Sequence, residues 1–293
     1  MSPNNDAAHV NLGVALEDKG DSDGAIVEYR EALRLNPKND DARVDLGVSL
    51  GQKGDLDGAI AEYHDALRLN PNNENAHFNL GEALGQKGDT DGASGEFREA
   101  LRLNPKDDDA HFNFGVALSQ KGDWNGAVAE YREALRLNPE NGHAHYNLGI
   151  ELGKKRDWEG AIAEYHAALR LNPKNENAHV LLGMALSQKG DGDGAIGEYR
   201  EALRLNPKDG DAHFLLGGEL GIKGDREGEI AEYREALRLN PNDFHAHFSL
   251  GVALESMGDR EGALHEYREA YELKPQDPDY QKAYERLLND GKP

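Results

Sequence analysis

Histidine is the residue type in this chain best suited to bind a metal or transfer a proton, since there are twelve histidines and no cysteine. Seven of them recur at multiples of 34 residues, as His9, His77, His111, His145, His179, His213 and His247. Copies 34 residues apart are too distant to ligate one ion together. Two pairs, His143/His145 and His245/His247, are two residues apart, so on a helix their side chains diverge by about 200°. The sequence therefore predicts no metal site.

Three short acidic motifs, at residues 21–24, 55–58 and 191–194, are similar to the start of a calcium-binding loop. A calcium-binding EF-hand also needs a glutamate at the twelfth loop residue. That position is alanine in all three cases, at Ala32, Ala66 and Ala202. We therefore interpret the motifs as turns and helix caps.

Acidic residues that recur in every copy of a pattern indicate architecture, because a catalytic pair is expected once in one special environment. The glutamates from Glu28 to Glu266 recur in this way. Arg34 lies three residues after Glu31, a spacing that favours ion pairs along a helix. The sequence has no catalytic triad, phosphate loop or dinucleotide fingerprint. We expect no enzyme activity and no cofactor.

The net charge of −22 restricts the partners. A chain this acidic repels nucleic-acid phosphates and anionic membrane surfaces, so we expect neither as a partner. No apolar run approaches the roughly 20 residues that cross a bilayer. Residues 1–10 are polar and lack a signal-peptide pattern, so the expected location is cytoplasmic.

Proline sets a strict period in the sequence. Nine prolines are spaced 34 residues apart, namely Pro3, Pro37, Pro71, Pro105, Pro139, Pro173, Pro207, Pro241 and Pro275. Nearly the same text returns between them, so one supersecondary unit is copied eight times. We number the repeats one to eight, at residues 6–39, 40–73, 74–107, 108–141, 142–175, 176–209, 210–243 and 244–277.

Each repeat is predicted to hold two helices. In repeat one, helical apolar spacing covers about residues 6–19 and 23–35, and Gly20 separates the two segments. Asn39 and its equivalents are positioned to cap the next first helix. Gly13 recurs in mid-helix, where glycine is costly, and we interpret it as a close approach to Ala25. The recurring Gly24 has no explanation from the sequence.

The chain resembles the tetratricopeptide repeat family. The resemblance rests on Leu12, Gly13, Leu16, Ala25, Tyr29, Ala32 and Pro37, repeated eight times. Where the family often has tryptophan, four residues before the glycine, this chain has histidine or Arg43. The resemblance implies an all-α, right-handed solenoid of helix pairs, a single array whose first helices line a concave groove. Residues 278–290 would form a capping helix, with an apolar stripe of Tyr280, Ala283, Tyr284, Leu287 and Leu288.

We expect the groove to bind a peptide through side chains of the first helices that do not pack between helices. One column carries an amide ladder of Asn11, Asn79, Asn113 and Asn147, which can both donate to and accept from a peptide backbone. Beside it lie aromatic residues, including Phe78, Phe112 and Tyr146, which either contact the ligand or fill the gap to the next repeat. Further along the helices are Gln86 and Gln120.

The ladder becomes apolar in repeats six and seven, at Leu181 and Leu215, near Met184 and Ile222. This change predicts either a hydrophobic anchor for the ligand or a self-association patch. The groove columns hold eight acids against one base, Lys154, which gives about seven negative charges. The acids are Glu17, Asp18, Asp41, Asp45, Glu82, Asp109, Asp211 and Glu255.

These features predict a protein-interaction scaffold that holds a neutral or basic peptide or helical segment. Two alternatives remain open. One is a structural protein that self-assembles through the ends of the array or the Leu181/Leu215 patch. The other is a designed array, or one excised from a longer protein, with no ligand of its own.

Overall fold

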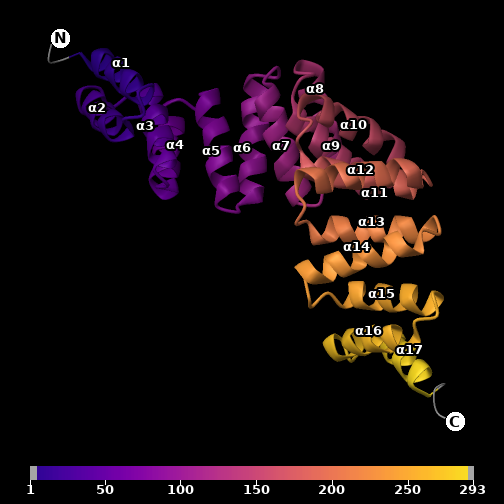
Figure 1. Cartoon of the computed structure of the whole chain (residues 1–293). Helices are drawn as coiled ribbons and strands as arrows, with labels where there is room; N and C mark the ends of the chain where they lie inside the picture. The colour runs from indigo at the N-terminus through magenta and orange to yellow at the C-terminus, as the bar shows by residue number, and fades with distance from the viewer. Residues whose placement is uncertain (1–4, 290–293) are drawn as a thin grey trace. The chain divides into compact units, whose positions relative to one another are not determined.

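The computed structural model describes residues 5–289, which form seventeen helices (Figure 1). Each repeat contributes two of them. The first helices are α1 (Asp6–Glu17), α3 (Asp40–Gln52), α5 (Glu74–Gln86), α7 (Asp108–Gln120), α9 (Gly142–Lys154), α11 (Glu176–Gln188), α13 (Gly210–Ile222) and α15 (Phe244–Ser256). The second helices are α2 (Ser22–Leu35), α4 (Leu56–Leu69), α6 (Thr90–Leu103), α8 (Trp124–Leu137), α10 (Trp158–Leu171), α12 (Gly192–Leu205), α14 (Arg226–Leu239) and α16 (Arg260–Leu273). The last helix is α17 (Pro278–Asn289).

Side-chain caps explain where the helices begin. The Asn39 side chain accepts a hydrogen bond of 3.0 Å from the Ala42 amide at the start of α3, as the sequence predicts. Asp21 caps α2 by accepting from the Gly24 amide at 2.9 Å. A Cβ atom at Gly24 would lie 2.6 Å from the Asp21 carboxylate. The capping aspartate therefore accounts for the second glycine column.

The mid-helix glycine lies where the two helices of a repeat approach closely, and its nearest partner is an aromatic ring rather than the Ala25 position. A Cβ atom on Gly115 would lie 2.7 Å from the Tyr131 ring, and the same ring position blocks Gly13 and its other equivalents. Tyr131 is only 2% exposed. The glycine therefore makes room mainly for the aromatic ring of the second helix. At Gly217 the Ala25 equivalent is also close, since an added Cβ atom would lie 3.3 Å from the Glu229 carbonyl oxygen.

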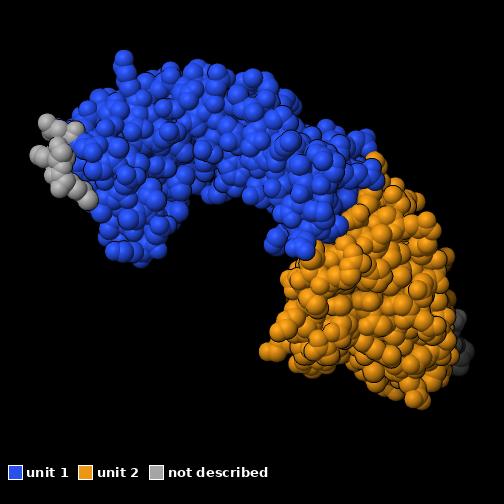
Figure 2. Space-filling view, turned by 90° about the horizontal axis from the view of Figure 1, so that it is seen from above, with its two compact units in different colours: residues 1–151 blue, residues 152–293 orange. Residues whose placement is uncertain are grey.

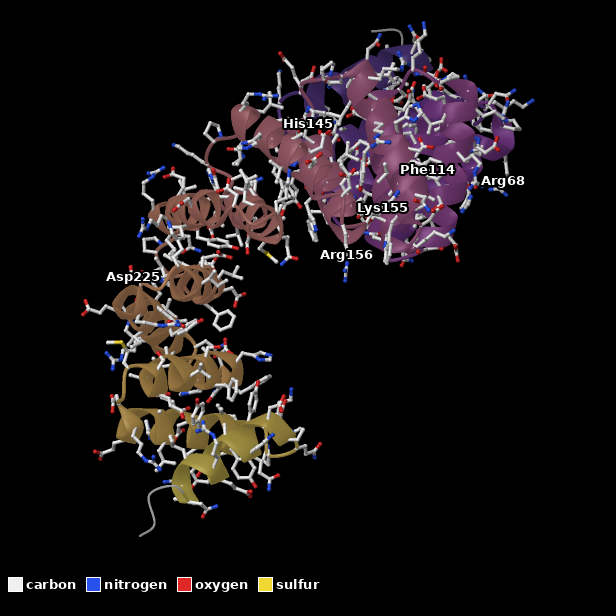
Figure 3. All side chains as sticks on the ribbon, turned by 90° about the vertical axis from the view of Figure 1, so that its right-hand side faces the viewer. Arg68, Phe114, His145, Lys155, Arg156 and Asp225 are labelled. Atoms are coloured by element: carbon white, nitrogen blue, oxygen red, sulfur yellow. The ribbon has the colours of Figure 1, made fainter. Side chains whose placement is uncertain are left out.

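The turn between the two helices uses a left-handed residue. Glycines fill this position with φ near +80° in seven repeats, as at Gly122. Repeat five instead carries Arg156 with φ 61°, the one non-glycine residue with positive φ between residues 5 and 289 (Figure 3). An L-residue in this conformation costs roughly 1–2 kcal/mol.

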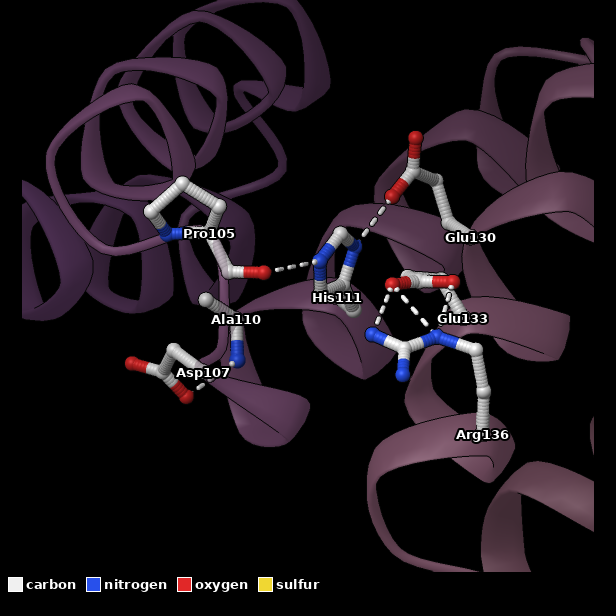
Figure 4. A network of polar contacts seen from close by, with 7 residues as sticks. All are labelled: Pro105, Asp107, Ala110, His111, Glu130, Glu133 and Arg136. Carbon is white, nitrogen blue, oxygen red and sulfur yellow. Dashed lines mark hydrogen bonds and ion pairs between the residues drawn. The ribbon is translucent and has the colours of Figure 1, made fainter.

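The recurring histidine joins the two helices of its repeat to the loop that precedes them. His111 on α7 contacts Glu130 of α8 through Nδ1 at 2.6 Å (Figure 4). Its Nε2 atom lies 3.3 Å from the Pro105 carbonyl oxygen in the preceding loop. In repeat two, Arg43 contacts Glu62 at 2.8 Å and so joins the same two helices. Both partners of the histidine ring, a carboxylate and a carbonyl oxygen, are hydrogen-bond acceptors.

The helices divide into two compact units, residues 1–151 and 152–293, which Figure 2 colours separately. In unit 1, the core joins side chains of successive repeats, including Tyr29, Leu46, Tyr63 and Leu80. The second helices α2, α4 and α6 also contact the first helix of the next repeat, and the first helices α1, α3, α5 and α7 contact their neighbours in turn. In unit 2 the same stacking includes α11 to α17. Repeats that contact only their neighbours form a solenoid.

The helix α17 covers the last repeat as predicted. Tyr280 and Leu287 are buried, whereas Leu288 remains 39% exposed. Arg286 of α17 donates two hydrogen bonds of 2.7 Å to Glu255 of α15. The predicted cap includes Asp290, which lies outside the described residues.

Candidate peptide-binding site

Two pockets open between consecutive first helices of unit 1. The first, of about 290 Å³, lies between α3 and α5 and is lined by Val48, Gly51, Gln52, Leu56, Ala59, Tyr63, Asn79, Glu82, Ala83 and Gln86. The second, of about 300 Å³, lies between α5 and α7 and is lined by Gly81, Glu82, Gly85, Gln86, Ala93, Phe97, Asn113, Val116, Ala117 and Gln120. Both have an apolar floor and amide side chains among their walls. They are suited to hold side chains of an extended segment.

The pockets form where small residues meet between repeats. The twelfth residue of one repeat faces the tenth residue of the next, and these are Gly51 with Ala83, then Gly85 with Ala117. A Cβ atom on either glycine would meet only an alanine Cβ, at 3.8 Å. The space beside both glycines is therefore open.

A serine and a glutamate occupy the same two positions at other junctions. Ser119 Oγ donates a hydrogen bond of 2.5 Å to Glu151, which is 2% exposed. Ser187 donates in the same way to the buried Glu219. Between repeats one and two the order is reversed, because Ser49 of repeat two donates to Glu17 of repeat one. This serine–glutamate junction fills the space that the glycine–alanine junction leaves open.

In unit 2, larger side chains approach the equivalent glycines. The Trp158 ring lies 3.7 Å from where a Cβ atom of Gly153 would be. At Gly221 that distance is 2.5 Å to the carboxylate of Glu229, which pairs with Arg226 at 2.6 Å. The other seven repeats have alanine at the position of Glu229. These substitutions occupy the space beside the glycines.

The amide residues predicted as ligand contacts lie partly in the pockets. Asn79 and Gln86 line the first pocket, and Asn113, Gln86 and Gln120 line the second. The Asn79 amide donates to the Asn75 carbonyl oxygen at 2.7 Å, which leaves its own oxygen to accept. Asn113 donates to Glu82 at 3.4 Å. Their contact with a ligand stays a prediction.

The two remaining asparagines of the ladder have different surroundings. Asn11 is exposed on α1. Asn147 is half-buried on α9 and hydrogen-bonds with the Tyr131 side chain. The ladder is therefore not uniform, and its central members are the ones beside pockets.

The rings of the aromatic column pack on second-helix rings of their own repeat, and Phe248 packs in addition on Tyr280 of α17, with 4.8 Å between the ring centroids. The Phe78 ring lies 5.9 Å from the Phe97 ring, and Phe112 lies 5.9 Å from Tyr131. Tyr146 is half-buried, and burial raises its pKa. The Phe78 and Phe112 contacts join the two helices of one repeat, whereas Phe248 also fills the gap to the next element.

The apolar residues of repeats six and seven differ in exposure. Leu181 and Leu215 are half-buried, and Leu215 packs on a core cluster of unit 2. Met184 is 42% exposed and Ile222 is 80% exposed. The accessible apolar surface is therefore provided by Met184 and Ile222.

The acids of the groove columns are not all equally free to attract a ligand. Arg286 lowers the pKa of Glu255 by direct hydrogen bonding and so offsets its charge. Burial, with the charges of Asp41 and Glu17, raises the pKa of Asp45 to about 6. Burial, with the charge of Asp109, also raises the pKa of Glu82. The predicted seven negative charges therefore overstate the field, which is concentrated in repeats one to four.

Sequence reasoning overlooked the junction pairs and the special place of Glu82. The signal was present, because both appear when equivalent positions of the eight repeats are compared. The tenth residue of a repeat is alanine in five repeats and serine or glutamate in the other three. In those three repeats its hydrogen-bond partner lies 32 residues earlier in the sequence. No group of three metal-ligating side chains was found among residues 5–289, and no helix there could span a membrane.

Family models described as TPR repeat match residues 16–54, 49–88, 84–122, 117–155 and 222–258. Models described as tetratricopeptide repeat match residues 146–210, 182–218 and 244–277. No curated protein matches the chain.

Solved structures agree with these family matches. The structure of YrrB, described as a TPR protein with an unusual peptide-binding site, has a TM-score of 0.59 and 25% identity over 66% of this chain and 100% of YrrB. MamA has a TM-score of 0.54 and 26% identity over 57% of this chain and 97% of its own. The pilF protein of Pseudomonas aeruginosa, at 21% identity, TM-score 0.60 and coverage of 74% and 97%, shares the fold. The chain belongs to the tetratricopeptide repeat family.

Proposed function

We propose that this protein is a non-catalytic scaffold that binds a neutral or basic peptide segment along its first helices. The observation that carries the proposal is the pair of open pockets in repeats two to four, with Asn79, Asn113 and Gln86 among their walls. The structural similarity to YrrB, whose description names a peptide-binding site, supports the same use of the fold.

The physical basis is a rigid row of hydrogen-bonding groups beside small apolar spaces. Asparagine and glutamine can pair with a peptide backbone whatever its side chains are. The pockets can then select among side chains by shape and charge. The acidic balance of the chain disfavours an acidic segment.

The test is affinity capture followed by titration of each captured partner. Replacing Asn79, Asn113 and Asn147 with alanine should weaken binding by about tenfold or more, since each lost hydrogen bond costs around 0.5–1.5 kcal/mol. Asn242→Ala is the matched control, because Asn242 is an exposed loop residue. Unchanged affinity of the triple variant for a verified partner would contradict the proposal.

Self-association is a second candidate, and the exposure of Ile222 favours it. Its equivalents in repeats two, three, four and six are glutamine, so Ile222→Gln restores the common residue. Multi-angle light scattering over a concentration series should show dimers for the parent chain and monomers for the variant. A monomer at all concentrations would exclude this candidate.

A further inference from the structure

Glu82 is the single acid at its position in the eight repeats. The ninth residue is otherwise apolar or glycine, as Val14, Val48, Val116, Ile150, Met184, Gly218 and Val252. Repeats two and four, on either side of Glu82, both carry valine. Since valine suffices for the fold at this position, the carboxylate is not needed to build the array.

Glu82 is also the charged residue that the two pockets share. It lies in the wall of both, between Gln52 and Asn79 on one side and Asn113 on the other. The side chain is half-buried and forms no ion pair within residues 5–289. Its recorded hydrogen bond is the long contact of 3.4 Å from Asn113. A desolvated carboxylate with so little compensation favours a cation beside it.

We propose that repeats two to four select an arginine side chain in the bound peptide, with its guanidinium paired to Glu82. This inference rests on the proposed function and names the ligand chemistry of the same groove. The guanidinium has five N–H donors in one plane. Two can reach a carboxylate together, and the rest can reach the amide oxygens of Gln52, Asn79 or Gln86.

The pocket shape favours a peptide side chain over a free ion. Each pocket is about 290–300 Å³ and open on one side, so a long side chain can enter while the main chain stays outside. The apolar floor, which includes Ala59 and Tyr63 in the first pocket, suits the methylene stem of arginine. The neighbouring pocket remains available to the next side chain of the same segment.

The experiment uses the full chain and peptide pools with one fixed central residue, which is arginine, lysine, citrulline or glutamate. Fluorescence anisotropy should show the arginine pool binding about tenfold more tightly than the citrulline pool, because a hydrogen bond to a charged group is worth about 1.5–3 kcal/mol. Glu82→Gln and Glu82→Val should each remove this preference. Equal affinity for the two pools, or no binding of the arginine pool, would overturn the inference.

Two further variants separate the pocket from the general field. Asp211→Asn removes the same charge from an exposed acid of repeat seven and should leave the arginine preference intact. Gly51→Ser combined with Ala83→Glu installs the serine–glutamate junction in the first pocket, where the arginine stem would lie. It adds a negative charge, yet it should weaken the arginine pool because the space is filled. Equal loss with Asp211→Asn, or tighter binding with the filled junction, would refute selection at Glu82.

Failure of this inference is distinguishable from failure of the proposed function. If captured partners still depend on Asn79 and Asn113 while Glu82→Gln has no effect, the groove binds peptides without selecting arginine. If the arginine preference depends on Glu82 while the asparagine variants bind normally, the amide ladder is wrong and the charge site stands.

Discussion

The serine–glutamate junction provides the sharpest test of how neighbouring repeats are joined. Ser119 on α7 donates a hydrogen bond of 2.5 Å to Glu151 on α9, whose side chain is 2% exposed. We expect Ser119→Ala to destabilise the fold by about 1.5–3 kcal/mol, because it removes a donor to a buried charged group. Glu151→Ala should cost less, about 1 kcal/mol, since it leaves a neutral hydroxyl without its partner.

The double variant should be close to the parent protein in stability. Ser119→Ala with Glu151→Ala approximates the glycine–alanine junctions at Gly51 and Gly85, where an added Cβ fits at 3.8 Å. The coupling energy of the double-mutant cycle, which is the cost of the double variant minus the costs of both single variants, should therefore be about 2.5–4 kcal/mol in magnitude. The filled junction would then be an alternative to the open one, rather than a requirement of the fold.

Tryptophan fluorescence in urea is the appropriate assay. The two tryptophans, Trp124 and Trp158, lie at the starts of α8 and α10, the second helices of the repeats that carry this junction. Local reporters are needed because repeat arrays can unfold in parts. The equivalent cycle at Ser187 and Glu219 serves as a replicate, followed by circular dichroism because repeats six and seven hold no tryptophan. A coupling energy below about 0.5 kcal/mol in both cycles would refute the reasoning, since distant sites add to that accuracy.

Three further predictions each concern the replacement of one residue. Asp45→Asn should stabilise the fold by about 1 kcal/mol at pH 7, after allowance for solvent screening, and by nothing at pH 3.5. The pKa of Asp45 is raised to about 6 in the folded parent protein, so the parent loses stability as pH rises from 4 through 6, and the asparagine variant does not. Urea titrations at both pH values check this. Arg156→Gly should add about 0.5–1 kcal/mol by relieving the left-handed backbone, measured by thermal denaturation, and a lower midpoint would contradict this. His247→Gln should cost more at pH 5.5 than at pH 8.5. Burial lowers the pKa of His247, but hydrogen bonds to Glu266 and the Pro241 carbonyl raise it by more, so its stabilisation is present at low pH and lost as pH rises through the folded pKa. Equal costs at the two pH values would show that the charged ring is not stabilising.

Local sequence rules predicted the helices because the same start and stop signals recur in the eight repeats. The Asn39 cap, the break at Gly20 and the stop before Pro37 need only short-range reasoning. Period and signature residues were also sufficient for the family. The sequence predicted a close approach at Gly13 but not its nearest partner, because helical spacing places Gly13 near both Ala25 and Tyr29, and side-chain direction decides which is nearer.

The site was less predictable because pockets depend on pairs of residues in different repeats. Asn79 and Gln86 were selected from their columns, and they do line a pocket. Phe78 was selected in the same way, but its ring packs on Phe97 of its own repeat. A column shows which side of a helix a residue occupies, whereas it does not show what the neighbouring helix presents to it.

A uniform array makes its departures informative, since seven copies of a position measure what the fold alone requires. Arg156 is less favourable for the fold than its equivalents, because glycine adopts a positive φ at lower cost. Glu82 is not needed for the fold, because valine occupies the same position in the neighbouring repeats. The junction pairs are compatible with the fold in either form, because both serine with glutamate and glycine with alanine occur between stacked repeats. They differ in whether space remains, and the open form occurs on both sides of Glu82. A carboxylate placed where two adjacent junctions are both left open is what selective binding requires, and packing alone gives no reason for that coincidence.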